Sequence, residues 1–165
     1  MSGLLARRPA LRKSVSATTR PARDGERHGE DYRFLRPEEF EAAAVAGEFL
    51  EFAEVHGHRY GTPRAPVEAA IAAGDTVVLE IDVQGARSVR EADPSALLIF
   101  VEPPSWDVLR ARLESRKTDP PEVIEHRLAN ARAELAAAGD FDHRVVNDDL
   151  EGAISQVVRI IGGAE

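Results

Sequence analysis

Hydrophobic and polar positions follow two different periods along the chain, and these predict strands and helices in turn. Residues 76–83 (TVVLEIDV) and 96–101 (ALLIFV) are nearly continuous apolar runs, which is typical of strands covered on both faces. Residues 49–55 alternate instead, as a strand with one buried face does. Glycines bracket positions 58–60, and this predicts the turn of a hairpin. Further strands are expected over 15–19, 31–35 and 144–147.

Prolines and glycines mark the helices. Pro37 stands at a good first helical position and Gly47 follows the last apolar position of that segment, while Gly74 closes a second helix that begins near Pro63. Residues 4–12 suggest a helical turn or two ended by Pro9. Strands that alternate with helices predict a parallel α/β sheet. The remaining helices are expected over 86–91, 106–116 and 122–138.

Composition limits the class of protein. A chain of 165 residues has room for one domain with a proper core. Its net charge of −8 argues against a general nucleic-acid binder, which normally carries a basic face. The absence of cysteine excludes disulfides and thiolate chemistry, and no stretch approaches the roughly 20 apolar residues of a membrane span. We therefore predict a cytoplasmic protein that binds neither nucleic acid nor membrane.

The decapeptide 14–23 (SVSATTRPAR) combines hydroxyl groups with two arginines three residues apart. The planar fork of arginine matches phosphate oxygens in a bidentate way, and hydroxyl and backbone N–H donors complete such a cradle. The alternative is that Arg20 and Arg23 are solvated residues of a turn around Pro21, since arginines in polar loops are usually exposed. This stretch alone leaves both interpretations open.

Five longer motifs carry a resemblance to a known family. The segments SVSATTRPARDGERHGEDYRFL, GEFLEFAEVHGHRYGTP, VVLEIDVQGA, LIFVEPPSWDVLRARLESR and VVNDD occur in the order and spacing found in guanylate kinases. The similarity runs from about Leu4 to the C-terminal helix. It implies an α/β fold, with a parallel sheet flanked by helices and a small antiparallel insert that binds GMP. It also implies one domain over 1–165, with its core in 1–23 and 75–165 and the insert in about 24–74.

By this resemblance, an acceptor site for GMP lies between the sheet and the insert. Two arginines, two phenols and a hydroxyl suit a phosphate dianion, and a carboxylate can accept from both the N1–H and the 2-amino group of guanine. Glu51 is thus the expected determinant of guanine specificity, with Thr62 at the O6 edge and Glu80 on the guanine side. Taken singly, each group also fits an ordinary role on a strand. The residues implied to hold the phosphate are Ser16, Arg20, Arg23, Tyr32 and Tyr60.

The resemblance also implies catalytic groups. Asp82 ends an apolar run, where open α/β sheets place ligand groups, and is expected to face Mg²⁺ or water. Mg²⁺ is expected only where a nucleoside triphosphate binds, and the five histidines show no spacing typical of a metal site. Asn147 matches a residue beside the donor base. The arginines implied to neutralise the phosphoryl group in flight are Arg112, Arg116 and Arg127.

One motif that usually defines these kinases does not occur in the 165 residues. Neither lysine, Lys13 or Lys117, belongs to a GxxxxGK[ST] loop, which cradles the phosphates of a nucleotide. We therefore expect the first strand and the P-loop to be absent. The usual GRGT is SRKT at 115–118, and the loss of both glycines is expected to stiffen a lid that closes on ATP.

Three functions remain open. The favoured prediction is a homologue that binds GMP, or a related guanine nucleotide, with weak or absent phosphotransferase activity. The alternatives are an active guanylate kinase whose N-terminal segment is lost from this chain, and an interaction module that binds a phosphorylated peptide. By the resemblance, the missing strand lies between 76–83 and 96–101, and unpaired buried edges are costly. Those strands then close up, or N-terminal residues or a partner chain fill the gap, which favours a homodimer.

Overall fold

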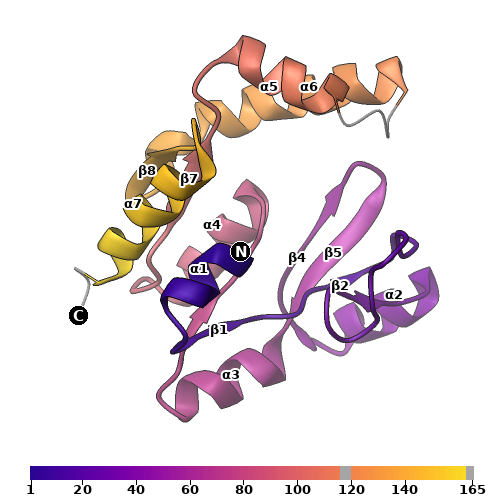
Figure 1. Ribbon diagram of the computed structural model, residues 1–165. Coiled ribbons are helices and arrows are strands. Elements are labelled where there is room, and N and C mark those ends of the chain that lie inside the picture. The colour runs from indigo at the N-terminus through magenta and orange to yellow at the C-terminus, as the bar shows by residue number, and fades with distance from the viewer. Residues whose placement is uncertain (116–119, 163–165) are drawn as a thin grey trace. The chain divides into compact units, whose positions relative to one another are not determined.

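The computed structural model describes residues 1–115 and 120–162, and these form two units (Figure 1). One unit is Arg8–Ala96, and the other combines Met1–Arg7 with Leu97–Glu165. This division differs from the predicted core and insert, because 8–23 and 75–96 group with 24–74; the single domain stays a prediction. The helices are α1 (Ser2–Arg7), α2 (Pro37–Val45), α3 (Arg64–Ala72), α4 (Val83–Ala92), α5 (Trp106–Ser115), α6 (Pro121–Ala136) and α7 (Leu150–Gly162), with a 3₁₀ turn at Ala138–Asp140. The strands are β1 (Leu11–Lys13), β2 (Ala17–Thr18), β3 (Arg33–Phe34), β4 (Phe49–Val55), β5 (His58–Pro63), β6 (Thr76–Val78), β7 (Ile99–Glu102) and β8 (His143–Val146).

The hairpin β4–β5 dominates the first unit, and it forms part of a four-stranded sheet in the order β3-β2-β5-β4. The predicted strand over 49–55 is confirmed, but the turn lies earlier than expected. Val55 pairs with His58, so only His56 and Gly57 connect the strands, and both have positive φ (53° and 77°). Two positive φ angles are what a tight hairpin turn with the right twist requires. Tyr60 consequently lies within β5.

The insert is not purely antiparallel. β5 is antiparallel to β2 and β4, whereas β2 and β3 are parallel, with Ala17 opposite Arg33. A parallel pair needs a long connection that returns the chain to its starting edge, and residues 19–32 provide it. Gly25 and Gly29 lie in this connection with φ of 85° and 84°. β2, expected in the core of the fold, thus belongs to the sheet of the insert.

A small aromatic core holds this sheet against α2. Phe40 has none of its surface exposed, and its ring stacks on that of Phe49 with centroids 4.5 Å apart. Ala17 completes the buried cluster. Gly61 makes room for it, because a Cβ at that position would lie only 3.0 Å from Phe49 and 3.1 Å from Phe40. Aromatic stacking of this kind adds to the burial of apolar surface.

The two helices of this unit begin and end where prolines and glycines predict. Pro37 opens α2, and the side chain of Glu39 accepts a hydrogen bond from the Arg36 N–H, which satisfies a donor at the helix start. Gly47 and Gly74 follow α2 and α3 with φ of 70° and 86°, the left-handed conformation that commonly ends a helix. These boundaries are therefore set by local sequence.

Besides β2 and β3, two parallel pairs form sheets of their own. β1 pairs with β6, and β7 pairs with β8. The helical turn predicted before Pro9 is α1, whereas β1 after it was not among the predicted strands. The run 76–83 pairs only as far as Val78, opposite the last residue of β1, and Asp82 then caps the start of α4. Within the described residues, each apolar run pairs with a single strand. The predicted burial on both faces is incomplete for β7, where Val101 is 53% exposed.

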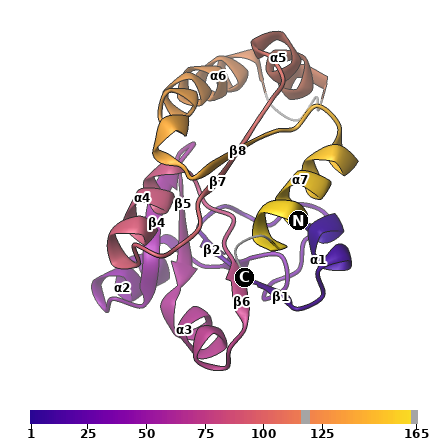
Figure 2. The same cartoon turned by 90° about the vertical axis from the view of Figure 1, so that its left-hand side faces the viewer.

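In the second unit, α1 lies beside α7, and α5 beside α6 (Figure 2). Arg7 at the end of α1 forms an ion pair with Glu151 and donates a hydrogen bond to Ser155, both on α7. Arg132 on α6 places its guanidinium 4.8 Å from the centre of the Trp106 ring on α5. Over the residues that the structure describes, no helix is both long and apolar enough to cross a bilayer.

Candidate functional site

A cavity of about 170 Å³ lies within the unit Arg8–Ala96. Its walls come from the residues just before β2 and β3, from the hairpin β4–β5 and from the segment that joins β6 to α4. Segments far apart in the sequence thus meet in one hollow. The predicted site residues that line it are Ser16, Tyr32, Glu51, Tyr60, Glu80 and Asp82.

Glu51 is the buried acid of this cavity, with only 7% of its surface exposed. It lies opposite Thr62 across the hairpin, and the register shifts between Phe49 and Glu51. A bulge of this kind redirects the side chain beside it. The hydroxyl of Thr62 donates a hydrogen bond of 2.5 Å to Glu51 Oε1. One carboxylate oxygen is therefore anchored.

Burial raises the pKa of the Glu51 carboxyl. The cause is the loss of water around the charged form, and the nearby charge of Asp82 acts in the same direction. The hydrogen bond from Thr62 opposes the rise, because it stabilises the carboxylate. A buried acid with a perturbed pKa in a cavity is a typical feature of a functional site.

Thr62 has a different partner from the one expected. Its side chain is fully buried, and its hydroxyl donates to Glu51. A hydroxyl has one donor hydrogen, so in this arrangement it is not available to the O6 of a guanine. In the structure, the Thr62 hydroxyl contacts Glu51 and positions its carboxylate.

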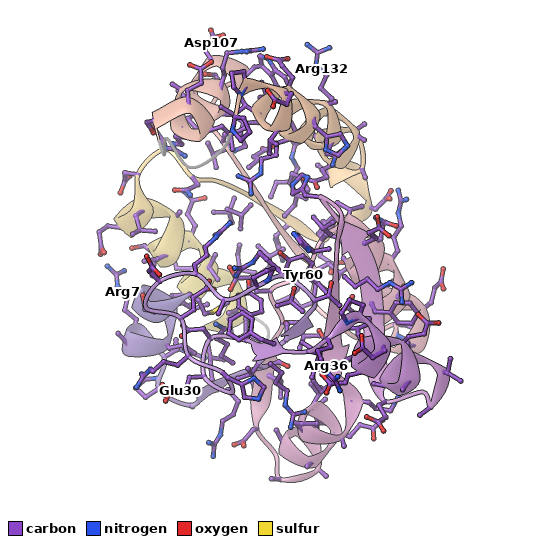
Figure 3. The ribbon with its side chains drawn as sticks, turned by 90° about the vertical axis from the view of Figure 1, so that its right-hand side faces the viewer. Arg7, Glu30, Arg36, Tyr60, Asp107 and Arg132 are labelled. Carbon is purple, nitrogen blue, oxygen red and sulfur yellow. The ribbon has the colours of Figure 1, made fainter. Side chains whose placement is uncertain are left out.

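The two tyrosines, Tyr32 and Tyr60, both line the cavity. The ring of Tyr32 meets that of Tyr60, labelled in Figure 3, edge to face with centroids 6.0 Å apart. The guanidinium of Arg20 lies 5.5 Å from the centre of the Tyr32 ring. Burial raises the pKa of the Tyr32 phenol, and the charge of Glu80 adds to the rise. The phenol therefore keeps its proton at neutral pH and can donate a hydrogen bond.

Arg20 is held by an acid that the sequence did not single out. Its Nη2 donates to both carboxylate oxygens of Glu26, at 2.8 and 2.9 Å, and Nη1 donates to the Pro21 carbonyl at 2.6 Å. The pairing raises the pKa of Arg20 and lowers that of Glu26. The Arg23 N–H also donates to Glu26, at 2.7 Å. An acid three residues after Arg23 was the available signal, but spacing alone does not show which arginine it binds.

Arg23 itself is exposed and is not among the residues that line the cavity. It contributes to the loop through its backbone. The neighbouring Arg20 is half-buried and lies beside both tyrosines, since Tyr60 also raises its pKa through a hydrogen bond. Of the two arginines in the decapeptide, only Arg20 therefore has its guanidinium against the tyrosines of the cavity.

Asp82 lines the cavity and also caps the start of α4. Its Oδ1 accepts from the Gly85 N–H at 2.8 Å and so caps α4, while its Oδ2 accepts from the Gln84 amide at 3.3 Å. Mg²⁺ on a nucleotide needs only one or two protein carboxylates besides the phosphates, and Asp82 in the cavity wall fits that demand. Over the described part of the chain, no group of three or more acidic or histidine side chains gathers as a metal site.

The remaining predicted residues belong to the other unit. Arg112 donates hydrogen bonds from Nη1 to the Asn147 carbonyl (2.8 Å) and from Nη2 to the Asp148 carbonyl (2.9 Å). The Asn147 N–H in turn donates to the Glu102 carbonyl at 2.7 Å. Two residues predicted separately thus meet at the end of β8. Arg127 is half-buried on α6, and Arg116 lies outside the described residues.

Comparison with known proteins matches residues 2–164 to the family model named Guanylate kinase. This chain belongs to the guanylate kinase family. The assignment agrees with the α/β fold and with the resemblance carried by the motifs.

Two bacterial guanylate kinases show how far the likeness extends. A guanylate kinase of Nocardia farcinica is 55% identical over 156 residues, which cover 93% of this chain and 81% of that protein. One of Gloeobacter violaceus is 55% identical over 155 residues, which cover 94% and 76%. Among solved structures, guanylate kinase from Anaplasma phagocytophilum has a TM-score of 0.82 at 35% identity, and the match covers 98% of this chain and 80% of that chain.

Proposed function

We propose that this protein binds GMP in the cavity around Glu51 and accepts on it the terminal phosphoryl group of ATP, as a guanylate kinase. The observation that carries the proposal is the shared cavity: a buried acid, two phenols and the Ser16 hydroxyl line one hollow. The relatives named above bear the name guanylate kinase, which favours an active enzyme over an inactive homologue.

Glu51 supplies the preference for guanine in this proposal. Its ionised carboxylate accepts from the N1–H and the 2-amino group of the base, a donor pair that adenine lacks. Hydrogen bonds to a charged partner contribute about 1.5–3 kcal/mol each. Because Glu51 is almost fully buried, a base without these donors leaves it unsatisfied. Thr62 reaches the O6 edge only when its hydroxyl leaves Glu51, and Glu80 faces the guanine side.

The phosphate of GMP is bound by Ser16, Tyr32, Tyr60 and Arg20. Both phenols and the hydroxyl donate to phosphate oxygens, and the guanidinium adds a charge-assisted bond. Glu26 holds Arg20 in place before the nucleotide arrives. Arg23 is exposed on the same loop, and it joins the phosphate contacts if the loop folds over the ligand.

Transfer of the phosphoryl group needs positioning and charge neutralisation. Asp82 would meet Mg²⁺ when a nucleoside triphosphate binds, and the ion would neutralise charge between the phosphates. The arginines proposed to act on the group in flight are Arg112, Arg116 and Arg127, with Asn147 beside the donor base. A cytoplasmic location is part of the same proposal.

A second candidate is GMP binding without transfer by these 165 residues alone. They contain no GxxxxGK[ST] loop, and such a loop supplies much of the grip on the donor phosphates. The two candidates share the acceptor site and differ only in turnover.

Calorimetric titration with GMP, AMP and ATP tests the binding site, and a coupled assay for ADP on the same sample tests transfer. We expect GMP to bind and AMP to bind at least tenfold more weakly. Glu51→Ala should abolish this preference, whereas Glu54→Ala, on the exposed side of the same strand, should keep it.

The outcomes separate the candidates. Turnover of ATP that depends on GMP supports the kinase, and binding of GMP without turnover supports the second candidate. An equal affinity for GMP and AMP, or a Glu51→Ala variant with unchanged selectivity, overturns both. A phosphoserine peptide serves as a further probe, since tight binding of it without GMP binding identifies an interaction module.

A further inference from the structure

We infer that Gly85 is a positioning residue that sets the preference for guanine, because only glycine leaves room for the Glu51 carboxylate. The inference rests on the proposed GMP site and names a residue outside the nucleotide contacts. Gly85 lies in the first turn of α4, and that helix contacts β4, the strand that carries Glu51.

The space beside Gly85 is occupied by the acid. A Cβ at this position would lie far inside van der Waals distance of Glu51 Oε2, 3.0 Å from Glu51 Cδ and 3.3 Å from the Cβ of Ile81. Gly85 is buried, and its N–H is committed to Asp82 Oδ1 at 2.8 Å. The backbone is therefore fixed by the cap of α4, and the carboxylate is the group that has to move.

The Glu51 carboxylate has little freedom to move without changing its orientation in the cavity. Thr62 holds Oε1 at 2.5 Å across the hairpin, and the residue is 7% exposed. Of the two carboxylate oxygens, Oε2 is the one near Gly85. A methyl group there turns the carboxylate about its anchored oxygen, so the two oxygens no longer face the paired N1–H and 2-amino donors.

The position carries no strain that would itself demand glycine. Gly85 is not among the glycines of positive φ, and alanine in a helix is ordinarily favoured over glycine. On local grounds, alanine should therefore stabilise α4. The reason for glycine at this position is the neighbouring carboxylate.

The experiment is a double-mutant cycle on GMP binding, measured by calorimetry on the 165-residue chain with GMP and IMP. IMP keeps the N1–H donor and lacks the 2-amino group. We expect Gly85→Ala to weaken GMP binding about 10- to 100-fold and to lower the ratio of GMP to IMP affinity. In the Glu51→Ala background, the same change should have no further effect on either nucleotide.

Gly152→Ala is the matched control. Gly152 stands in the first turn of α7, and its N–H donates to Asp149 Oδ1 at 2.7 Å, as that of Gly85 does to Asp82. A Cβ there would lie 2.6 Å from the Asp149 carboxylate, so this variant reports the effect of crowding a helix cap at a residue that does not line the cavity. We expect it to leave the GMP to IMP ratio unchanged.

Every outcome decides the inference. An equal loss of affinity from Gly85→Ala with and without Glu51, or no loss at all, overturns it. If Gly85→Ala alone fails to fold, Glu51→Ala/Gly85→Ala should fold, because the collision is gone; a double variant that also fails shows that the glycine serves the backbone and overturns the inference. A Glu51→Ala variant that binds GMP as the parent does refutes the proposed function instead.

Discussion

The hydrogen bond between Thr62 and Glu51 gives a stability that depends on pH. We consider Thr62→Val, which keeps the branched shape of a fully buried side chain and removes the hydroxyl that donates to Glu51 Oε1. While Glu51 is ionised, the lost bond is to a charged acceptor and costs about 1.5–3 kcal/mol. Once Glu51 is protonated, a neutral bond is lost and the cost is about 0.5–1.5 kcal/mol.

The sign follows from the raised pKa of Glu51 in the folded protein. As pH rises, the unfolded chain releases the proton of this residue near its usual pKa of about 4.3, whereas the folded chain keeps it longer. The folded state then binds more protons, so Glu51 lowers the free energy of unfolding as pH rises through this window. Thr62→Val removes a bond that opposes the raised pKa. The variant should therefore raise the pKa of Glu51 in the folded protein further and extend this pH range to higher pH.

The assay is urea unfolding of the parent, Thr62→Val and Thr62→Ser near pH 4.5 and near pH 8, in the absence of nucleotide. We expect Thr62→Val to be destabilised at both pH values, by about 1 kcal/mol more at the higher one. Thr62→Ser keeps the O–H donor and should show little pH dependence of its own. A destabilisation by Thr62→Val that is equal at the two pH values, or greater in acid, would refute the reasoning. So would a Thr62→Val effect on the free energy of unfolding that keeps the same pH dependence when Glu51 is replaced by Gln.

Three further predictions follow from the same unit. Phe40→Ala should lower the free energy of unfolding by about 3–5 kcal/mol in urea titrations, because Phe40 is fully buried against Phe49; a loss below about 1 kcal/mol would show that the aromatic core is not a main source of stability. Arg20→Lys should weaken GMP binding at least tenfold by calorimetry and leave guanosine binding unchanged, since lysine lacks the planar fork; equal losses for both ligands would place Arg20 away from the phosphate. Guanosine, which has no phosphate to titrate, should bind more weakly as pH falls through the raised pKa of Glu51, and a flat profile from pH 8 down to the ordinary carboxyl range of about pH 4.3 would contradict the role of its carboxylate.

Local signals explain the parts of the fold that the sequence predicted well. Pro37 and Gly47 bound α2, and Gly74 follows α3, because these residues act through their own φ angles. The strand β4 was predicted, but its apolar positions did not indicate the buried face, because Glu51 is buried and Phe52 is 52% exposed. The resemblance carried by the motifs also named six residues that line one cavity.

Pairing between distant segments explains the parts that the sequence missed. The run 76–83 forms a strand only over Thr76–Val78, because extended residues become a strand only where a neighbour pairs with them, and β1 ends at Lys13. The residue types at 79–83 did not indicate that the strand ends at Val78. The turn at His56–Gly57 shows the same dependence, since the register of the hairpin decided which residues it contains.

The sequence by itself determined the family, the boundaries of α2 and α3, and the types of residue in the acceptor site. Only the tertiary structure decided what those residues do for one another. It gave the hydroxyl of Thr62 to Glu51, paired Arg20 with Glu26 and set Gly85 against the buried carboxylate. Propensity and motif spacing act along the chain, whereas burial, hydrogen-bond partners and steric space arise only when distant segments are brought together.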